Sequence, residues 1–277
     1  MTQQELEHYL LNFYGYGQWA SDFYFIGIEE GGGGNPCLVD SKLSSFLAFM
    51  ETKDNLVDNY THQMTRIPVL CREGEFFINR IQPTWKPFIK ILLTLSGLNP
   101  HPADAEILHY QVNSWGRVNS EPAHAVLELL PLPSPGLTPS HWQYDLWTNG
   151  FPFPYHLVAR QQYINLIFQE RINHLAVQIN YYKPRLVIFY AKSNPYLTFC
   201  KQIVSLVSPL CAWNNLGVLH SVLLNNGGYR NYNAEYCKVT HDNGSSTLFV
   251  MCNQPAGVYG NPANYFDSLT IGIQPLI

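Results

Sequence analysis

Charged side chains are scarce in this chain of 277 residues, because Asp, Glu, Lys and Arg together make up only 13% of it. Aromatic residues make up 14%, and this balance excludes an intrinsically disordered protein and a coiled coil. No apolar run reaches the roughly 18 residues that a membrane-spanning helix needs. Residues 1–14 include two acids and lack the basic and then apolar pattern of a secretion signal. We therefore expect a soluble, cytoplasmic protein that spans no membrane.

Metal-binding cysteine and histidine motifs are also absent from the sequence. The six cysteines form no CxxC pair, and no histidine pair at zinc-binding spacing lies near them. This spacing favours reduced thiols in a cytosolic protein and gives no support to an iron–sulfur cluster. We predict neither a metal nor a cofactor.

The net charge of −4 does not by itself indicate a nucleic-acid-binding protein, but the charges are unevenly distributed. Residues 1–60 contain nine acids and two lysines, whereas residues 61–277 contain eleven acids and fourteen bases. The longer segment is therefore net positive, and a basic face on it is compatible with a polyanionic partner.

Short, wholly apolar segments alternate with helical patterns along the chain. Helices are expected over 2–14, 41–52, 85–95 (with Thr84 as N-cap), 159–182 and a stretch that ends at 207. Strands are expected over 23–28, 124–130, 185–190, 216–224, 235–240 and 247–252. Apolar strands between helices are typical of a parallel sheet that is covered on both faces. We predict one α/β domain with three α/β/α layers and a central, mostly parallel sheet.

Ligands of such sheets bind beyond the carboxyl ends of the strands, so the residues that follow each strand are the informative ones. Glu29 and Glu30 follow the first apolar strand and precede four glycines, which let the backbone approach a ligand closely. A carboxylate there can activate water or stabilise a cation. A capped turn and a metal-binding loop are the alternatives. The segment lacks the GKS/T ending of a P-loop and the spacing of a dinucleotide fold, so ATP and NAD are not favoured.

Two of these strand-end segments resemble motifs of the uracil-DNA glycosylase superfamily. FIGIEEGGG, at 25–33, resembles the first motif, and Gly27 matches its opening glycine. Glu29 stands where the family carries its water-activating Asp or Asn. QPAG, at 254–257, resembles the second motif, with Gln254 at the position of a His or Asn.

The resemblance extends along most of the chain in the same order. KPFIKILLTLSGL, at 86–98, resembles the helix ending in Gly-Leu that precedes the second strand of such enzymes. Glu30 replaces the usual Pro and Ala256 the usual Ser, so the sequence departs from the pattern of uracil enzymes. The resemblance implies a single uracil-DNA-glycosylase-like domain over residues 1–277.

The resemblance assigns catalytic roles to three residues. Glu29, or else Glu30, would lie beneath the sugar, stabilise its developing positive charge and orient water. Gln254 would donate a hydrogen bond to the departing base, as would backbone N–H groups of the same loop. The alternative for Gln254 is a side chain that only ties two loops together.

Base recognition falls on Glu128, which stands where the family carries the Asn that pairs with uracil. A carboxylate only accepts hydrogen bonds, so it suits a base with an exocyclic amine, of the cytosine type and modified or not. An acid that merely pairs with an arginine is the alternative. Trp85 would stack on the flipped base, and core packing is the alternative for it. The remaining predicted contacts are base contacts from Gly31 and Gly32, and DNA-phosphate contacts from Lys192, Ser193, Ala256 and Gly257.

These assignments predict a monofunctional DNA glycosylase, since no lysine stands at a motif position to form a Schiff base. DNA is the expected partner, and no obligatory protein partner is evident. The activity would serve base repair or defence against phages that carry modified bases. A non-catalytic module that binds nucleic acid or protein is the alternative, and a nucleoside or nucleotide hydrolase on a doubly wound sheet is a third interpretation.

Overall fold

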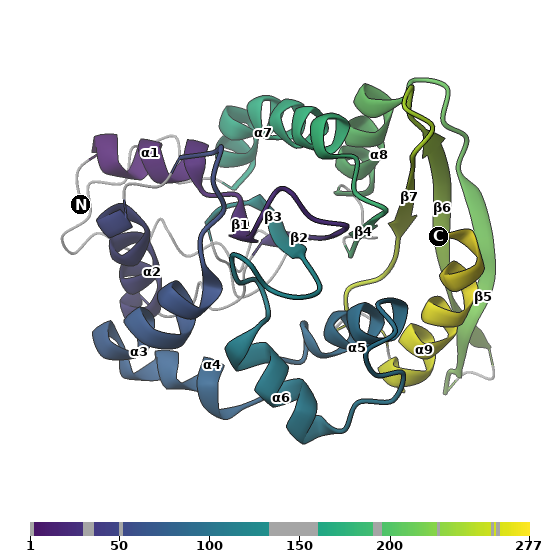
Figure 1. Ribbon diagram of the computed structural model, residues 1–277, viewed down its shortest axis with the longest axis horizontal. Helices are drawn as coiled ribbons and strands as arrows, with labels where there is room; N and C mark the ends of the chain where they lie inside the picture. The colour runs from purple at the N-terminus through teal and green to yellow at the C-terminus, as the bar shows by residue number, and fades with distance from the viewer. Residues whose placement is uncertain are drawn as a thin grey trace.

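The computed structural model describes residues 3–29, 36–49, 52–132, 160–190, 196–225, 228–255, 258 and 261–277 (Figure 1). The elements of the N-terminal part are α1 (Gln3–Asn12), β1 (Gly15–Gly17), β2 (Phe23–Glu29), α2 (Pro36–Phe49), a π-helix (Tyr60–Arg66), α3 (Ile67–Leu70), α4 (Phe76–Asn79), α5 (Lys86–Leu95), α6 (Asp104–Asn113) and β3 (His124–Leu130). Those that follow are α7 (Arg160–Tyr182), β4 (Leu186–Phe189), α8 (Tyr196–Val207), β5 (Asn214–Leu223), β6 (Tyr229–Thr240), β7 (Ser246–Met251) and α9 (Pro262–Ile273).

The strands form one mixed sheet in the order β1-β3-β2-β4-β7-β6-β5. β3, β2, β4 and β7 are mutually parallel, whereas β1, β6 and β5 each pair antiparallel with their neighbours. The prediction of a mostly parallel sheet is therefore confirmed for the four central strands and wrong for the other three. For β5 and β6 the physical reason is local, because β5 and β6, and then β6 and β7, are joined by short turns, which only antiparallel strands allow.

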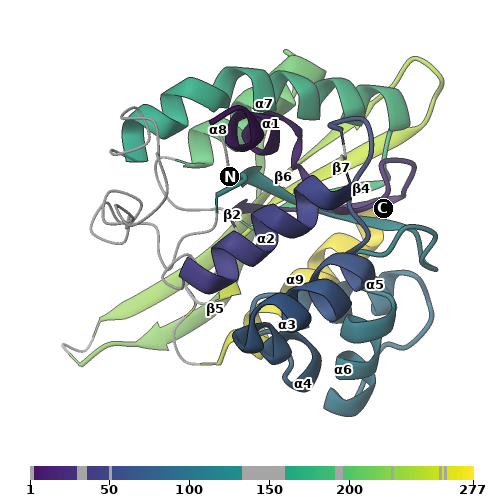
Figure 2. The same ribbon diagram turned by 90° about the vertical axis from the view of Figure 1, so that its left-hand side faces the viewer.

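The central strands are largely apolar because helices cover both of their faces. Every residue of β3 and β4 is buried. Figure 2 shows α7 and α8 on one side of the sheet and α5 and α9 on the other. A strand buried on both faces has no solvent-facing positions for polar side chains, which explains the continuous apolar runs.

The predicted strands over 23–28, 124–130, 185–190 and 247–252 are confirmed to within two residues. The predicted N-cap is wrong. Trp85 is the N-cap of α5 and no side chain caps the helix. A turn precedes the helix, in which the N–H of Trp85 donates to Gln82 O (3.0 Å). Pro87 lies in the first turn of α5 and has no N–H, so fewer donors there need a cap. No helix in the described ranges has the length and apolarity to cross a membrane.

Candidate functional site

The strand order puts a topological switch point between β2 and β4. β3 lies on one side of β2 and β4 on the other, so the chain crosses over β2 after completing β3. Such a reversal opens a crevice outside the carboxyl ends of the strands. We call the edge formed by the carboxyl ends of β2, β3, β4 and β7 the carboxyl edge.

Glu29 is the last residue of β2 and lies at the carboxyl edge, with its Cα opposite that of Leu130 in β3. The position of its main chain is thus the predicted one, while its side chain lies outside what the structure describes. Seven other predicted site residues also lie outside the described residues, namely Glu30, Gly31, Gly32, Lys192, Ser193, Ala256 and Gly257. Their assigned roles stay predictions.

Glu128 lies on β3 directly opposite Gly27 of β2, and it is buried with 4% of its surface exposed. A Cβ placed on Gly27 would lie 2.7 Å from Glu128 Oε2 and 2.6 Å from the hydroxyl oxygen of Tyr190. The carboxylate and the phenol therefore face the same side of Gly27, and no side chain fits between them. This explains why a glycine stands two residues before the end of β2.

Tyr190 follows β4 and forms a wall of this site. Its N–H donates to Ile26 O (3.0 Å), and its ring lies 4.4 Å from the ring of Phe88 on α5. Trp85, the predicted stacking residue, lies one turn earlier, is 8% exposed and stacks on Phe77 with ring centroids 6.1 Å apart. Among the aromatic residues at the start of α5, Phe88 is thus the one that the structure brings against Tyr190. No sequence signal distinguishes Phe88 from a core residue.

A buried arginine on α7 holds the main chain around Glu128 in place. Arg171 donates to the carbonyl oxygens of Glu128 (2.7 Å), Leu129 (2.7 Å), Phe13 (2.8 Å) and Leu10 (3.2 Å). Its guanidinium also lies 4.0 Å from the ring centroid of Tyr14.

Burial lowers the pKa of Arg171, and the neighbouring tyrosines and Glu128 oppose that shift. An arginine stays protonated in proteins, so a fixed positive charge sits behind Glu128. The alternative in which the Glu128 carboxylate pairs with an arginine stays a prediction, because the bond seen here joins Arg171 to the main-chain carbonyl of Glu128.

Gln254 follows β7 at the same edge and is half-buried. In the described part of the chain its side chain forms no hydrogen bond. The alternative in which Gln254 only ties two loops together is therefore not seen among the described residues. The neighbouring residue anchors this segment. The main-chain N–H of Asn253 donates to the Tyr265 hydroxyl (3.1 Å), which in turn donates to Asn233 O (3.3 Å). The start of the Gln254 loop is therefore fixed to β6 and α9.

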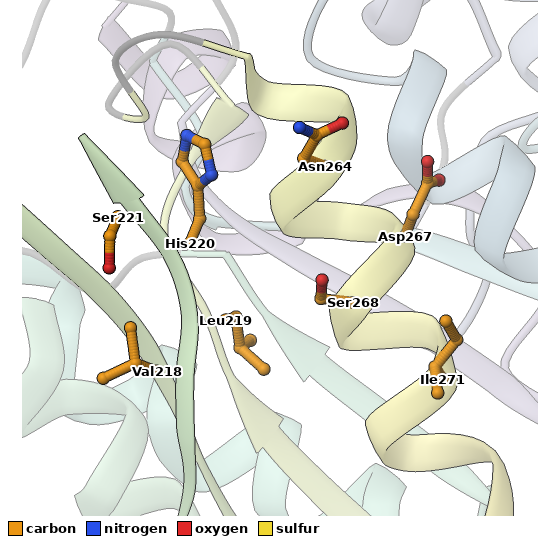
Figure 3. A pocket seen from close by; sticks show the side chains of 8 residues that line it. All are labelled: Val218, Leu219, His220, Ser221, Asn264, Asp267, Ser268 and Ile271. Atoms are coloured by element: carbon orange, nitrogen blue, oxygen red, sulfur yellow. The ribbon is translucent and has the colours of Figure 1, made fainter. Parts of the chain in front are cut away.

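A cavity of about 510 Å³ lies elsewhere, between β5 and α9 (Figure 3). Its lining comes from four successive residues of β5 and four residues of α9: Val218, Leu219, His220, Ser221, Asn264, Asp267, Ser268 and Ile271. Neither Glu128 nor Gln254 contributes to it. It is an open groove, since 59% of Val218 and 72% of Ile271 are exposed.

No family model, curated protein or solved structure matches this chain. The resemblance to the glycosylases thus rests on the sequence motifs alone. The described residues also contain no group of three His, Cys, Asp or Glu side chains placed to hold a metal ion. The carboxyl edge offers the acceptor-only carboxylate of Glu128, the amide of Gln254 and the acid at the end of β2, Glu29.

Proposed function

We propose that this protein is a monofunctional DNA glycosylase that hydrolyses the N-glycosidic bond of a flipped-out, amino-bearing base of the cytosine type. In this proposal the chain is a three-layer α/β/α domain that acts in the cytoplasm. The observation that carries it is the buried Glu128 carboxylate beside Gly27, at the carboxyl edge that also holds Glu29 and Gln254.

The base enters the site after leaving the helical stack, because its glycosidic bond is out of reach inside a duplex. Glu128 then accepts a hydrogen bond from the exocyclic amine. Uracil presents a carbonyl oxygen where cytosine presents this amine. With uracil, two hydrogen-bond acceptors, the Glu128 carboxylate and that carbonyl oxygen, would face each other and repel. Because Glu128 has little contact with water, this mismatch is poorly screened and the discrimination is strong.

Bond cleavage leaves positive charge on the sugar and negative charge on the base. An ionised carboxylate from Glu29 or Glu30 stabilises the sugar cation and orients the attacking water. The side-chain amide of Gln254 donates a hydrogen bond to the base as it leaves. Two adjacent acids repel each other, so one of the pair is expected to hold its proton to higher pH than the other.

Excision from a panel of oligonucleotides tests the proposal. Each duplex carries one candidate base (cytosine, a modified cytosine or uracil), and alkali cleavage reports the abasic site. Under single-turnover conditions Glu29→Gln should slow excision by about 10² to 10⁴-fold, the usual contribution of a general base, with DNA binding retained. Asp22→Asn is the matched control, because Asp22 precedes the amino end of the same strand and its side chain is 60% exposed.

The other outcomes separate the alternatives. Loss of excision in Glu30→Gln with full activity in Glu29→Gln transfers the role to the neighbouring acid. Glu128→Asn should move the preference towards uracil, and a wild-type protein that prefers uracil contradicts the assigned role of Glu128. A wild-type protein that binds DNA but excises nothing from the panel is a non-catalytic binding module.

A further inference from the structure

The β5–β6 hairpin is longer than the sheet that supports it. The last β6–β7 pair joins Glu235 to Met251, whereas β6 continues to pair with β5 as far as Tyr229, opposite Leu223. Six residues of β6 thus extend past the end of β7, which corresponds to about 20 Å at the usual rise of a strand. We call residues 218–223 and 229–233 the distal ribbon.

The distal ribbon projects from the carboxyl edge. β5 is antiparallel to β6, which is antiparallel to β7, so β5 runs in the same direction as the central strands. Its carboxyl end at Leu223 therefore points to the side where Glu29, Glu128 and Gln254 lie. Figure 2 shows the hairpin extending beyond the body of the protein.

The end of the ribbon exposes apolar and aromatic side chains. Leu223 is 62% exposed, Leu224 is 40% exposed and Tyr229 is 69% exposed. Arg230 is exposed beside them, with its guanidinium 5.9 Å from the ring centroid of Tyr232. An exposed cluster of this kind marks an interaction surface.

The charge of this segment identifies the partner that it suits. The sequence contains no Asp or Glu between Glu170 and Glu235, an interval that includes the whole distal ribbon. The ribbon itself carries Arg230 and asparagines and no carboxylate, so its end meets no repulsion from phosphates, while Asp267 of α9 lines the groove beside residues 218–221 at its base. A polyanion offers charge complementary to Arg230 along its whole length.

The ribbon is held firmly at its base. The Tyr265 hydroxyl of α9 donates to Asn233 O (3.3 Å), and the ring of His220 stacks on that of Tyr232 at 6.0 Å. Main-chain pairing then continues as far as Tyr229, and the N–H of Leu224 donates to Gly228 O (2.8 Å) to close the end. A two-stranded ribbon fixed in this way fits the width of a DNA groove.

We propose that the distal ribbon is an arm that lies in a groove of double-stranded DNA beside the carboxyl edge. Tyr229 and Leu223 contact bases or sugars, and Arg230 contacts a phosphate. The identity of the nucleic acid as DNA rests on the proposed function, whereas the arm itself follows from the register, the exposed side chains and the absence of carboxylates.

Fluorescence anisotropy with a fluorescein-labelled 30-base-pair duplex tests the arm without requiring excision. Leu223→Ser combined with Tyr229→Ala should weaken binding at least about tenfold, because it removes two large apolar side chains that the contact buries. Arg230→Gln should lower the slope of log affinity against log salt by about 1.

The matched control is Leu210→Ser combined with Tyr181→Ala. These residues are 95% and 76% exposed, but they lie just before the amino ends of β5 and β4, away from the carboxyl edge. The control should bind within about twofold of wild type. Thermal melting of both double variants verifies folding.

Two results overturn the arm: equal affinity in the ribbon and control variants, or no binding of the duplex by the wild-type protein. A dimer seen by light scattering that dissociates in the ribbon variant, with DNA affinity unchanged, assigns the surface to a second copy and also overturns it. Ribbon-dependent binding without excision from any panel duplex refutes only the glycosylase. Excision with ribbon-independent binding refutes only the arm.

Discussion

The centre of the seven-stranded sheet and its β5 edge are built on different principles. In β3 and β4 every residue is buried, whereas in β5 no residue is fully buried. The central strands are held by side chains packed on both faces. The distal ribbon is held by main-chain hydrogen bonds, by α9 and by a few contacts at its base. Packing is therefore dense where the sheet holds Glu128, while the end of the ribbon is exposed and available for contact.

The largest effect is expected at Arg171, which ties the central sheet to the N-terminal segment. Arg171→Leu leaves four main-chain carbonyls without their donor, and we expect a loss of about 3 to 5 kcal/mol in the free energy of unfolding. Arg230→Leu on the ribbon is the control and should cost less than about 0.5 kcal/mol. Urea unfolding of both variants measures the difference. Similar losses in the two variants would contradict the distinction between centre and ribbon.

Gly27→Ala should have the next largest effect. The new Cβ would lie within 2.7 Å of Tyr190 and Glu128 side-chain atoms, so strands or side chains must shift. This shift should lower the free energy of unfolding by about 1 to 3 kcal/mol. Gly272→Ala in α9 is the control, since its Cβ would meet nothing nearer than Leu216 Cδ2 at 3.7 Å and alanine favours a helix. Thermal unfolding should separate the two variants. An unchanged Tm for Gly27→Ala would show that the gap between Tyr190 and Glu128 is wider than the structure places it.

Acid should destabilise the packed part of the molecule through two buried histidines. Burial lowers the pKa of His62 to about 3 and that of His124 to about 4, from the 6.5 of a free histidine. The unfolded chain therefore binds protons more tightly, and stability falls as the pH falls from about 6.5 to 4. Each histidine contributes up to about 1.4 kcal/mol per pH unit. The free energy of unfolding is measured from pH 7 to 4.5. In His62→Leu it should fall less steeply with falling pH than in the wild type, because one of the two histidine contributions is gone. An unchanged pH dependence in that variant would refute the role of His62.

The sequence predicted the central strands because double-sided burial leaves uninterrupted apolar runs, as in 23–28 and 185–190. It missed residues 229–234 of β6, which are largely polar and belong to a strand only through main-chain pairing. The three-residue β1 and the π-helix Tyr60–Arg66 have no periodicity long enough to detect. At the candidate site, strand-end reasoning predicted that Glu128 and Glu29 lie in the last residues of their strands, as they do. It did not predict the positions of Tyr190, Phe88 and Arg171, because these follow from contacts between elements far apart in the sequence.

The hydrogen bonds of Arg171 also set an order in time. Its guanidinium binds the carbonyls of residues 10 and 13, at the end of the first helix. These hydrogen bonds can form only after a residue about 160 positions later has been synthesised. Until α7 has been made, these carbonyls and those of Glu128 and Leu129 have no guanidinium to accept from. We therefore expect the N-terminal half to leave the ribosome without these hydrogen bonds. The main chain around Glu128 at the carboxyl edge is tied to the first helix only after α7 docks.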